Sequence, residues 1–288
     1  MKRIAILGCE NSHADAFLTF IKEKEEFSDL KVVGIYSDER EAAERLNKEF
    51  GVPIMESFDA AVGNLDGLII TARHGDNHYK YAKPYIASGI PMFIDKPITI
   101  SEDEAIEFMR ELSENGCRIS GGSSLRHDLF VKQLAEEHRT ELTGKTVGGY
   151  VRAPFSIDSP YGGFYFYSEH LVDAVIEIFG RFPISVKTSK NGDQLHVLFH
   201  YEDYDVVGLY TKRHSYFASR MAEKGGNGAV IPFTNDWFYS ELSEFCSLFS
   251  DGQKTVDYES FIAPVFIMNA IERSMKSGKE EYIKRAEL

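Results

Sequence analysis

A lysine follows the carboxyl end of a short apolar run, and it is the first candidate for chemistry in this sequence. Residues 91–94 are apolar and lead into Asp95 and Lys96, and a second apolar run, 67–71, lies upstream. The helix-like segment 76–88 separates the two runs. Strand, crossover helix and strand form the unit of a parallel sheet, and ligands bind beyond the carboxyl ends of its strands. We therefore predict an active-site lysine; the alternative is a surface lysine fixed by a proline turn.

The N-terminus offers a candidate phosphate-binding turn. A β-like apolar run ends at Gly8, and a helical pattern starts a few residues later. This order places the positive end of a helix where a pyrophosphate would bind. The dinucleotide fingerprint G-x-G-x-x-G needs glycines where this chain has Glu10 and His13. Either the loop is rearranged so that Asn11 and Ser12 donate to phosphate, or the cofactor binds weakly or not at all.

A candidate ribose-binding position follows the second predicted strand, 31–36. Ser37 and Asp38 stand there, at about the expected distance from the first glycine. A carboxylate accepts hydrogen bonds from the ribose 2′-OH and repels a 2′-phosphate, so Asp38 favours NAD. Arg40 could serve a phosphate instead, which leaves NADP possible. Ser37 or Asp38 could also cap the next helix.

Residues 71–97 resemble a known family. The runs TARHGDNH at 71–78, ASG at 87–89 and FIDKP at 93–97 resemble the Gfo/Idh/MocA family of NAD(P)-dependent oxidoreductases. That family shows a Thr-Pro-x-x-x-His stretch, a helix ending in Gly and a strand ending Glu-Lys-Pro. Here His74 stands where the proline usually is, and Asp95 stands in for the glutamate.

This resemblance implies that two strand-end loops contact the cofactor. The residues it implies are Thr71, Arg73, His74, Asp95 and Lys96. The loop 71–78 would lie over the cofactor, with His78 helping to fix it. The alternating polar residues 74–78 open a helix, where metal ligands would be four residues apart, so we expect no metal site.

A second stretch, 162–173, looks like the family's Gly-Gly…Asp-x-x-x-His-x-x-Asp helix. The family's histidine maps to His170 and its last acid to Asp173, whereas Phe166 replaces its first acid. Residues three apart share a helix face, so Asp173 could orient the imidazole for proton exchange with a substrate hydroxyl. The alternative is a core-facing aromatic helix with a satisfied histidine.

Further substrate contacts are expected around the same helix. Arg126 resembles the arginine that sits near the family's site entrance, although it could be a surface residue at a helix start. The aromatic residues 165–167 could line a platform for a sugar. We expect three residues to contact substrate: Arg126, Tyr167 and Asp173.

The predicted elements define the fold class. Residues 1–121 should form a doubly wound parallel Rossmann sheet of about six strands, including 51–55, with a short helix at 57–62. Residues 122–288 should form an α+β domain with a mainly antiparallel sheet, used for substrate binding and oligomerisation. A glycine-rich junction, 121–124, should be flexible. Five strand-like runs are expected in the second half: 146–154, 184–189, 194–200, 205–211 and 215–219. The helices 236–250 and 260–276 carry apolar faces typical of ordinary core.

Composition excludes several classes of partner. The 288 residues are 43% hydrophobic and carry a net charge of −13 with no basic cluster, which argues against nucleic acid and anionic membranes. No apolar run reaches membrane-spanning length, and the N-terminal apolar run is too short for a signal peptide. Three widely spaced cysteines indicate reduced thiols and a cytoplasmic protein.

The leading hypothesis is therefore a cytoplasmic NAD(P)-dependent oxidoreductase acting on a sugar, cyclitol or related polyol. The resemblance implies that Lys96 polarises the reacting oxygen and that His170 exchanges its proton. Family analogy also implies a homodimer or homotetramer. An alternative is a non-catalytic regulatory relative that binds a metabolite or dinucleotide, which Glu10 and Phe166 favour. A third is a redox-neutral enzyme that holds NAD tightly.

Overall fold

The structure, a computed structural model, describes residues 1–250 and 256–286, which divide into two units. Among the described residues, the first unit combines 1–122 with 235–250 and 256–258, and the second combines 123–234 with 259–286. The sequence pattern assigns everything after 121 to one second domain. The structure differs, because the segment 235–258 carries an apolar helix face that packs into the first unit.

The first unit is built on a parallel sheet with strand order β2-β1-β3-β4-β5. Its strands are β1 (Lys2–Leu7), β2 (Leu30–Tyr36), β3 (Gly67–Ile70), β4 (Met92–Asp95) and β5 (Ile119–Gly122). All the side chains of β3, β4 and β5 are buried. Strands that are buried along their whole length, rather than at alternate residues, are typical of a parallel sheet covered on both faces.

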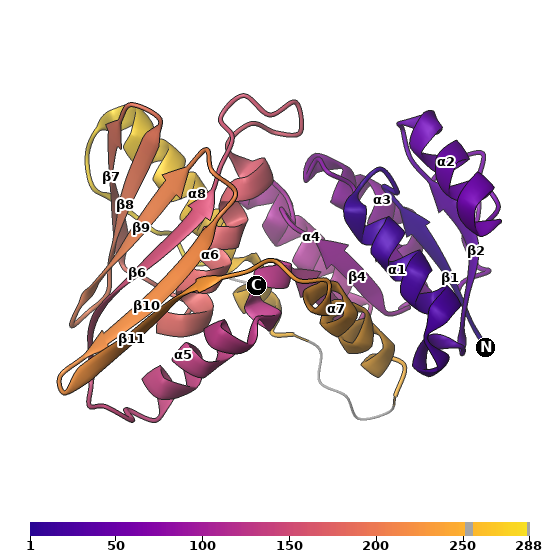
Figure 1. Ribbon diagram of the computed structural model, residues 1–288. Helices are drawn as coiled ribbons and strands as arrows, with labels where there is room; N and C mark the ends of the chain where they lie inside the picture. Colours follow the sequence, from indigo (N-terminus) through magenta and orange to yellow (C-terminus); the bar gives the residue numbers. More distant parts are fainter. Residues whose placement is uncertain (251–255, 287–288) are drawn as a thin grey trace. The chain divides into compact units, whose positions relative to one another are not determined.

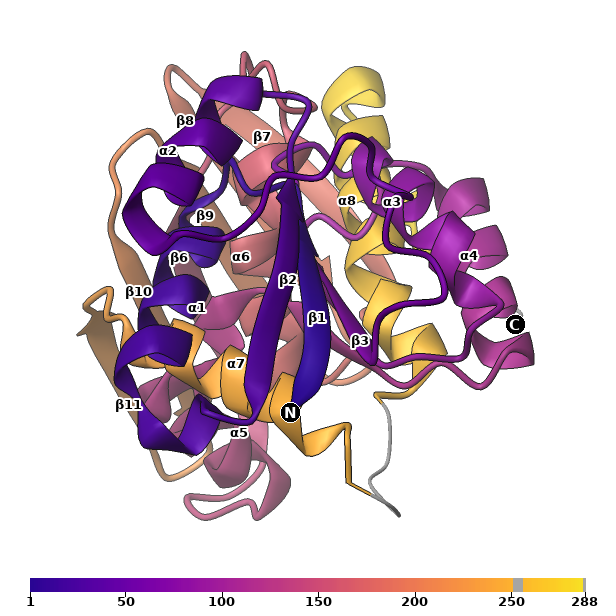
Figure 2. The same cartoon turned by 90° about the vertical axis from the view of Figure 1, so that its right-hand side faces the viewer.

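Helices cover both faces of this sheet, as a doubly wound fold requires. Figure 2 shows α1 and α2 on one side of β1–β3, and α3 and α4 on the other. The helices are α1 (Ser12–Glu23), α2 (Arg40–Phe50), α3 (Asp76–Ile86), α4 (Glu102–Glu114) and α7 (Asp236–Ser247), with a short 3-10 turn, η1 (Glu25–Phe27), after α1. The predicted Rossmann fold is therefore confirmed.

Two predicted elements of this unit are wrong. The expected strand 51–55 is reduced to an isolated bridge between Ile35 and Ile54, because Pro53 has no N–H to donate to a ladder. The expected helix 57–62 is a series of turns in which N–H groups bond three residues back. Six residues are too few to sustain a helix without strong packing.

The glycine-rich junction 121–124 is not the flexible link that was expected, because its two glycines belong to β5. Gly121 and Gly122 are buried residues of β5 and pair with Ile94 and Asp95 of β4. A Cβ on Gly121, whose φ is +129°, would lie 1.8 Å from the Ile94 carbonyl oxygen. Glycine therefore serves close packing here, rather than flexibility.

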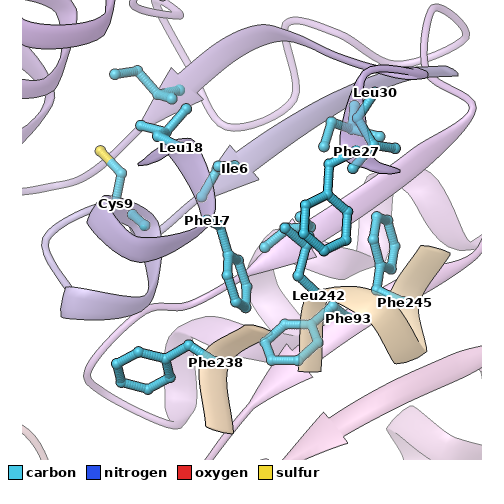
Figure 3. Packing of buried hydrophobic residues seen from close by; sticks show 14 of the residues in the cluster. Ile6, Cys9, Phe17, Leu18, Phe27, Leu30, Phe93, Phe238, Leu242 and Phe245 are labelled. Carbon is cyan, nitrogen blue, oxygen red and sulfur yellow. The ribbon is translucent and has the colours of Figure 1, made fainter. Parts of the chain in front are cut away.

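Helix α7 completes the core of the first unit although it comes late in the sequence. Figure 3 shows Phe238, Leu242 and Phe245 of α7 packed with Phe17 of α1 and Phe93 of β4. Burying three such side chains contributes roughly 5–9 kcal/mol by area. That gain explains why α7 belongs to this unit.

The second unit is a seven-stranded sheet with strand order β11-β10-β6-β9-β8-β7-β12. Only β6 and β9 pair in parallel, so the predicted mainly antiparallel sheet is confirmed. The strands are β6 (Thr146–Pro154), β7 (Ser185–Asn191), β8 (Gln194–His200), β9 (Asp205–Thr211), β10 (Tyr216–Ala222), β11 (Gly225–Ile231) and β12 (Glu281–Tyr282). The sequence did not predict β11, because its glycine-rich start lacks the apolar and β-branched residues typical of strands.

Helix α6 packs directly on this sheet. The helical elements are η2 (Ser124–His127), α5 (Leu129–Arg139), α6 (Tyr165–Phe179) and α8 (Tyr258–Ser277), and Figure 1 labels α5, α6 and α8. A Cβ on Gly149 of β6 would lie 2.1 Å from the Phe179 ring, and one on Gly208 of β9 would lie 2.9 Å from Leu171. These glycines let α6, which carries His170, approach the strands closely.

Across residues 1–250 and 256–286, no helix combines the length and apolar character that crossing a membrane requires.

Candidate functional site

The turn after β1 lies against the end of β3. Gly8 has φ +82°, and its N–H donates to the Tyr36 carbonyl oxygen at 2.8 Å. A Cβ at Gly8 would lie 2.2 Å from the Ala72 nitrogen, and Thr71 Oγ1 donates to the Gly8 carbonyl oxygen at 3.0 Å. Glycine alone suits both that φ and that approach. The first fingerprint glycine is thus kept at the point where strand order reverses, which is where open α/β sheets bind ligands.

Helix α1 begins at this turn without a side-chain cap. Asn11 is its N-cap residue, yet its Nδ2 donates to Asp95 Oδ2 at 2.7 Å, and its Oδ1 accepts from Ser12 Oγ at 3.2 Å. A helix start without a side-chain cap retains partial positive charge for an anion. Asn11 is buried and Ser12 is exposed, so Ser12 is the better placed of the two expected phosphate donors.

Glu10, at the second fingerprint position, is held by the ends of two strands. Its Oε2 accepts from Ser37 Oγ at 2.6 Å, and its Oε1 accepts from the Arg73 N–H at 2.9 Å. Ser37 follows β2 and Arg73 follows β3, so the carboxylate spans both flanks of β1. In the sequence Glu10 stands out only as a replaced fingerprint glycine, whereas the structure gives its carboxylate two specific donors.

Asp38, the expected ribose acid, has partners of its own. Its Oδ1 accepts from Tyr36 Oη at 2.7 Å and its Oδ2 from Lys80 Nζ at 3.4 Å. Burial acts to raise the Asp38 pKa, but hydrogen bonds from Tyr36 and Tyr81 outweigh it and lower the pKa. The carboxylate is half exposed beside an aromatic cluster of Tyr36, Phe58 and Tyr81.

The Asp95–Lys96 pair lies at the buried carboxyl end of β4. Asp95 is fully buried; its Oδ1 accepts from the Lys96 N–H at 2.7 Å, and its Oδ2 lies 3.3 Å from His13 Nδ1. Burial raises the Asp95 pKa, while His13 and Lys96 oppose the rise. Lys96 is itself only 5% exposed. A buried lysine beside a buried acid is the kind of constellation that active sites contain.

His13 and Glu241 extend this pair into a buried network that the sequence analysis missed. His13 Nε2 lies 3.2 Å from Glu241 Oε2 on α7, and His13 packs 4.4 Å from Phe238, between ring centroids. Burial lowers the His13 pKa, although Asp95 opposes this. The available signal was Glu241 itself, an acid on the apolar face of a helix, since glutamate is seldom buried without a partner.

The loop after β3 packs closely against the loop after β4. His78 is fully buried, and its Nε2 lies 2.7 Å from the Ala72 carbonyl oxygen. Burial lowers the His78 pKa to about 4, so the ring is neutral at pH 7. A Cβ on Gly75 would lie 2.8 Å from the Pro97 carbonyl oxygen. His74 is half-buried and accepts from the Asp76 N–H at 3.3 Å.

In the second unit, His170 and Asp173 meet at Ser123. The Ser123 Oγ lies 2.6 Å from His170 Nδ1, and the Ser123 N–H donates to Asp173 Oδ2 at 2.7 Å. All three side chains are buried. The prediction that Asp173 orients the imidazole stays a prediction; in the structure Ser123 contacts both His170 and Asp173, and sequence reasoning missed it. Its signal was weak, because it was a serine in a presumed linker.

Tyr167 lines a cavity of about 460 Å³ in the second unit. The cavity walls also include Asp158, Lys190, Asp193, Lys212 and His214. Its volume and polar lining suit a small hydrophilic molecule. Tyr165 does not share this position: it is buried, with its hydroxyl 3.4 Å from Glu272. The expected three-residue aromatic platform is therefore not formed.

Arg126, the other expected substrate contact, is half-buried in η2. Its Nε lies 3.4 Å from His127 Nε2.

Sequence and structure comparisons agree on the type of fold. Residues 2–123 match a family model described as an oxidoreductase family with an NAD-binding Rossmann fold. No protein of curated function matches the sequence. Solved structures match over nearly the whole chain at 12–17% identity, a level at which the likeness shows the fold alone.

Three of those structures illustrate the match. A myo-inositol dehydrogenase from Corynebacterium glutamicum is 17% identical, with a TM-score of 0.83, over 99% of this chain and 100% of that one. A myo-inositol 2-dehydrogenase from Lactobacillus plantarum is 15% identical, with a TM-score of 0.85, over 98% and 99%. GenD2 from gentamicin A biosynthesis, in complex with NAD, is 12% identical, with a TM-score of 0.85, over 98% and 96%.

Proposed function

Through residues 2–123 this chain belongs to the Gfo/Idh/MocA family of NAD-binding oxidoreductases, and we propose that it moves a hydride between NAD and a sugar, cyclitol or related polyol. The single observation that carries the proposal is Lys96, a buried lysine next to a buried acid at the carboxyl end of β4. The inositol dehydrogenases among the structural neighbours support the substrate class.

The residues of the first unit fit a dinucleotide. The Gly8 turn packs tightly against Ala72 and places the start of α1 at the carboxyl end of β1, and that helix start supplies positive charge for a pyrophosphate. Thr71, Arg73 and His74 would line the loop over the cofactor. When bound, NAD supplies the hydride acceptor for a substrate C–H bond.

Lys96 and His170 would act on the substrate oxygen. Lys96 would donate a hydrogen bond to that oxygen and stabilise negative charge on it. Because His170 Nδ1 faces Ser123, Nε2 is the nitrogen that would take the hydroxyl proton. Asp173, Tyr167 and Arg126 would position the polyol.

The first test is calorimetric titration of cofactor-stripped protein with NAD and NADP, followed by a polyol screen for NADH formation. Lys96→Met should abolish turnover while leaving NAD affinity within about threefold, because the lost ammonium acts on the substrate. Lys48→Met, which removes an exposed lysine of α2, is the matched control and should keep full turnover. Full activity of Lys96→Met would remove Lys96 from the mechanism.

A second function has specific support. Glu10 replaces a fingerprint glycine, and Phe166, which packs on Tyr161 and Tyr167, replaces the family's first acid. Both features favour a non-catalytic regulatory protein that binds a metabolite or dinucleotide. NAD binding without turnover of any polyol would support that role, and steady NADH formation would exclude it.

We also propose a cytoplasmic location and a homo-oligomeric state for this protein. Its three cysteines are free thiols, which supports a cytoplasmic location. The broad sheet of the second unit supports a homodimer or homotetramer, which light scattering of the purified protein would test.

A further inference from the structure

Glu10 occupies a position from which its carboxylate can take the place of the ribose acid that usually ends the second strand. In the usual arrangement an acid at the end of the second strand binds the ribose hydroxyls. Here that end carries Ser37, which is 5% exposed and donates to Glu10 Oε2 at 2.6 Å. A serine hydroxyl has one proton to donate, so Ser37 presents Glu10 rather than replacing it.

The backbone of the β3 loop fixes the same carboxylate from the other side. The Arg73 N–H donates to Glu10 Oε1 at 2.9 Å. Each oxygen therefore has one protein donor, from the ends of β2 and β3 respectively. A carboxylate has about four acceptor positions, so both oxygens retain capacity for another donor. Two further donors, one for each oxygen, are what the cis-diol of a ribose supplies.

Asp38 is less suited to this role. Its two oxygens accept from Tyr36 and from Lys80, which pull it toward the aromatic cluster beside α3. It is also half exposed, whereas Glu10 is partly buried at the turn that approaches Ala72.

We propose that Glu10 binds the 2′- and 3′-hydroxyls of the adenine ribose of NAD and excludes the 2′-phosphate of NADP. This inference rests on the proposed NAD binding. The ribose carboxylate has, in effect, moved from the strand β2 to the glycine loop, which accounts for a glutamate where the fingerprint has glycine.

Calorimetric titration of the full, cofactor-stripped chain tests this assignment. Glu10→Gln should weaken NAD binding roughly 10- to 100-fold, the loss expected for charge-assisted hydrogen bonds. It should also lower the preference for NAD over NADP at least tenfold. Glu41→Gln, which removes an exposed charge from the first turn of α2, is the matched control and should change neither.

A second measurement needs no mutation. Wild-type protein should bind 2′-deoxy-NAD roughly tenfold more weakly than NAD, because one of the two hydroxyl donors is missing. The Glu10→Gln protein should distinguish the two ligands less than threefold. Equal unfolding midpoints for wild type and Glu10→Gln would show that the variant is folded.

Three outcomes would overturn the inference and leave the proposed function standing. The first is a Glu10→Gln protein that binds NAD as tightly as wild type. The second is a loss of NAD affinity in Asp38→Asn and not in Glu10→Gln. The third is tighter NAD binding by Glu10→Gly, which would make Glu10 a competitor of the nucleotide. Wild-type protein that binds neither NAD nor NADP at millimolar concentration would overturn both the inference and the proposed function.

Discussion

The loops after β1 and β4 have kept the family pattern to very different degrees, and yet they contact each other. The loop after β4 retains the acid, lysine and proline, with aspartate for glutamate. The loop after β1 has Glu10 and His13 where glycines would be. Asn11, at the end of the first loop, and His13, in the first turn of α1, both reach Asp95, the last residue of β4, at 2.7 and 3.3 Å. His13, one of the two residues that break the fingerprint, is thus a partner of the acid in the other motif.

A broken motif can therefore mark an exchange of contacts. A glycine loop offers backbone to a ligand, whereas this loop offers side chains to its neighbours. Aspartate is one methylene shorter than glutamate, so its carboxylate stays closer to β4, where Asn11 and His13 reach it. Substitutions at these two strand ends and at the loop after β3 should show how far the three depend on one another.

The largest effect should come from the glycine that the first loop has kept. Gly8→Val should cost about 4–5 kcal/mol of unfolding free energy, because it combines a positive φ with a backbone clash at Ala72. Gly63→Ala is the control: its φ is +75° and its Cβ would meet nothing within 4 Å, so it should cost about 1 kcal/mol. Equal losses in urea unfolding would show that φ, not the contact with the β3 loop, matters at Gly8.

The next effect should come from the histidine that joins the loops. His13→Leu should cost about 3–4 kcal/mol, because it leaves the buried carboxylates of Asp95 and Glu241 without the imidazole between them. Adding Glu241→Leu should recover part of that loss. Additive losses in the double-mutant cycle would mean that His13 and Glu241 are not coupled.

A pH effect of up to about 3 kcal/mol should come from His78. Its pKa is about 4 in the folded protein and 6.5 when exposed, so the unfolded chain binds more protons between these values. Stability from this group is present above pH 6.5 and is lost as the pH falls toward 4. Urea unfolding of His78→Gln should show a flatter pH dependence than wild type over this window. An unchanged slope would mean that His78 is not buried in its neutral form.

The smallest effect should come from Asn11. Asn11→Ser should change stability by only about 1 kcal/mol, because the shorter side chain loses Asp95 but can cap α1. Asp128→Ala, which removes the cap that accepts from Phe130 and Val131 in α5, should cost a similar amount. A loss above 2 kcal/mol in Asn11→Ser alone would show that the Asp95 contact outweighs a helix cap.

Much of the fold could be predicted from local patterns, because nearby residues determine where many of its strands and helices begin and end. The strands 194–200 and 205–211 have the predicted bounds, since alternating apolar residues and turns define them. Pattern alone could not foresee β11, which pairs with β10 across a tight turn although its glycine-rich first half lacks strand-forming residues. It also could not foresee that 235–258 belongs to the first unit, since an apolar helix face does not specify which core it joins.

The candidate site also contains residues that the local sequence indicates and residues that only the fold identifies. Lys96, His170 and Gly8 stand out through type and spacing. His13, Glu241 and Ser123 act through partners that are far away in the sequence, and the local sequence gives at most a weak signal for them, such as an acid on an apolar helix face at Glu241. Glu10 could be recognised in the sequence as a replaced glycine. Its proposed role could not be predicted, because that role depends on the donors at Ser37 and Arg73, which only the fold brings to it.

The late position of α7 has a consequence for synthesis on the ribosome. The chain emerges from its N-terminus, so the sheet of the first unit is complete at Gly122, but the helix that covers Phe17 and Phe93 ends only at Ser247. At about 5–20 residues per second, those 125 residues (247 − 122) take roughly 6–25 seconds. During that interval the nascent first unit exposes an apolar surface. The second sheet, whose β6 to β11 lie between these two points in the chain, is made while that surface waits for its cover.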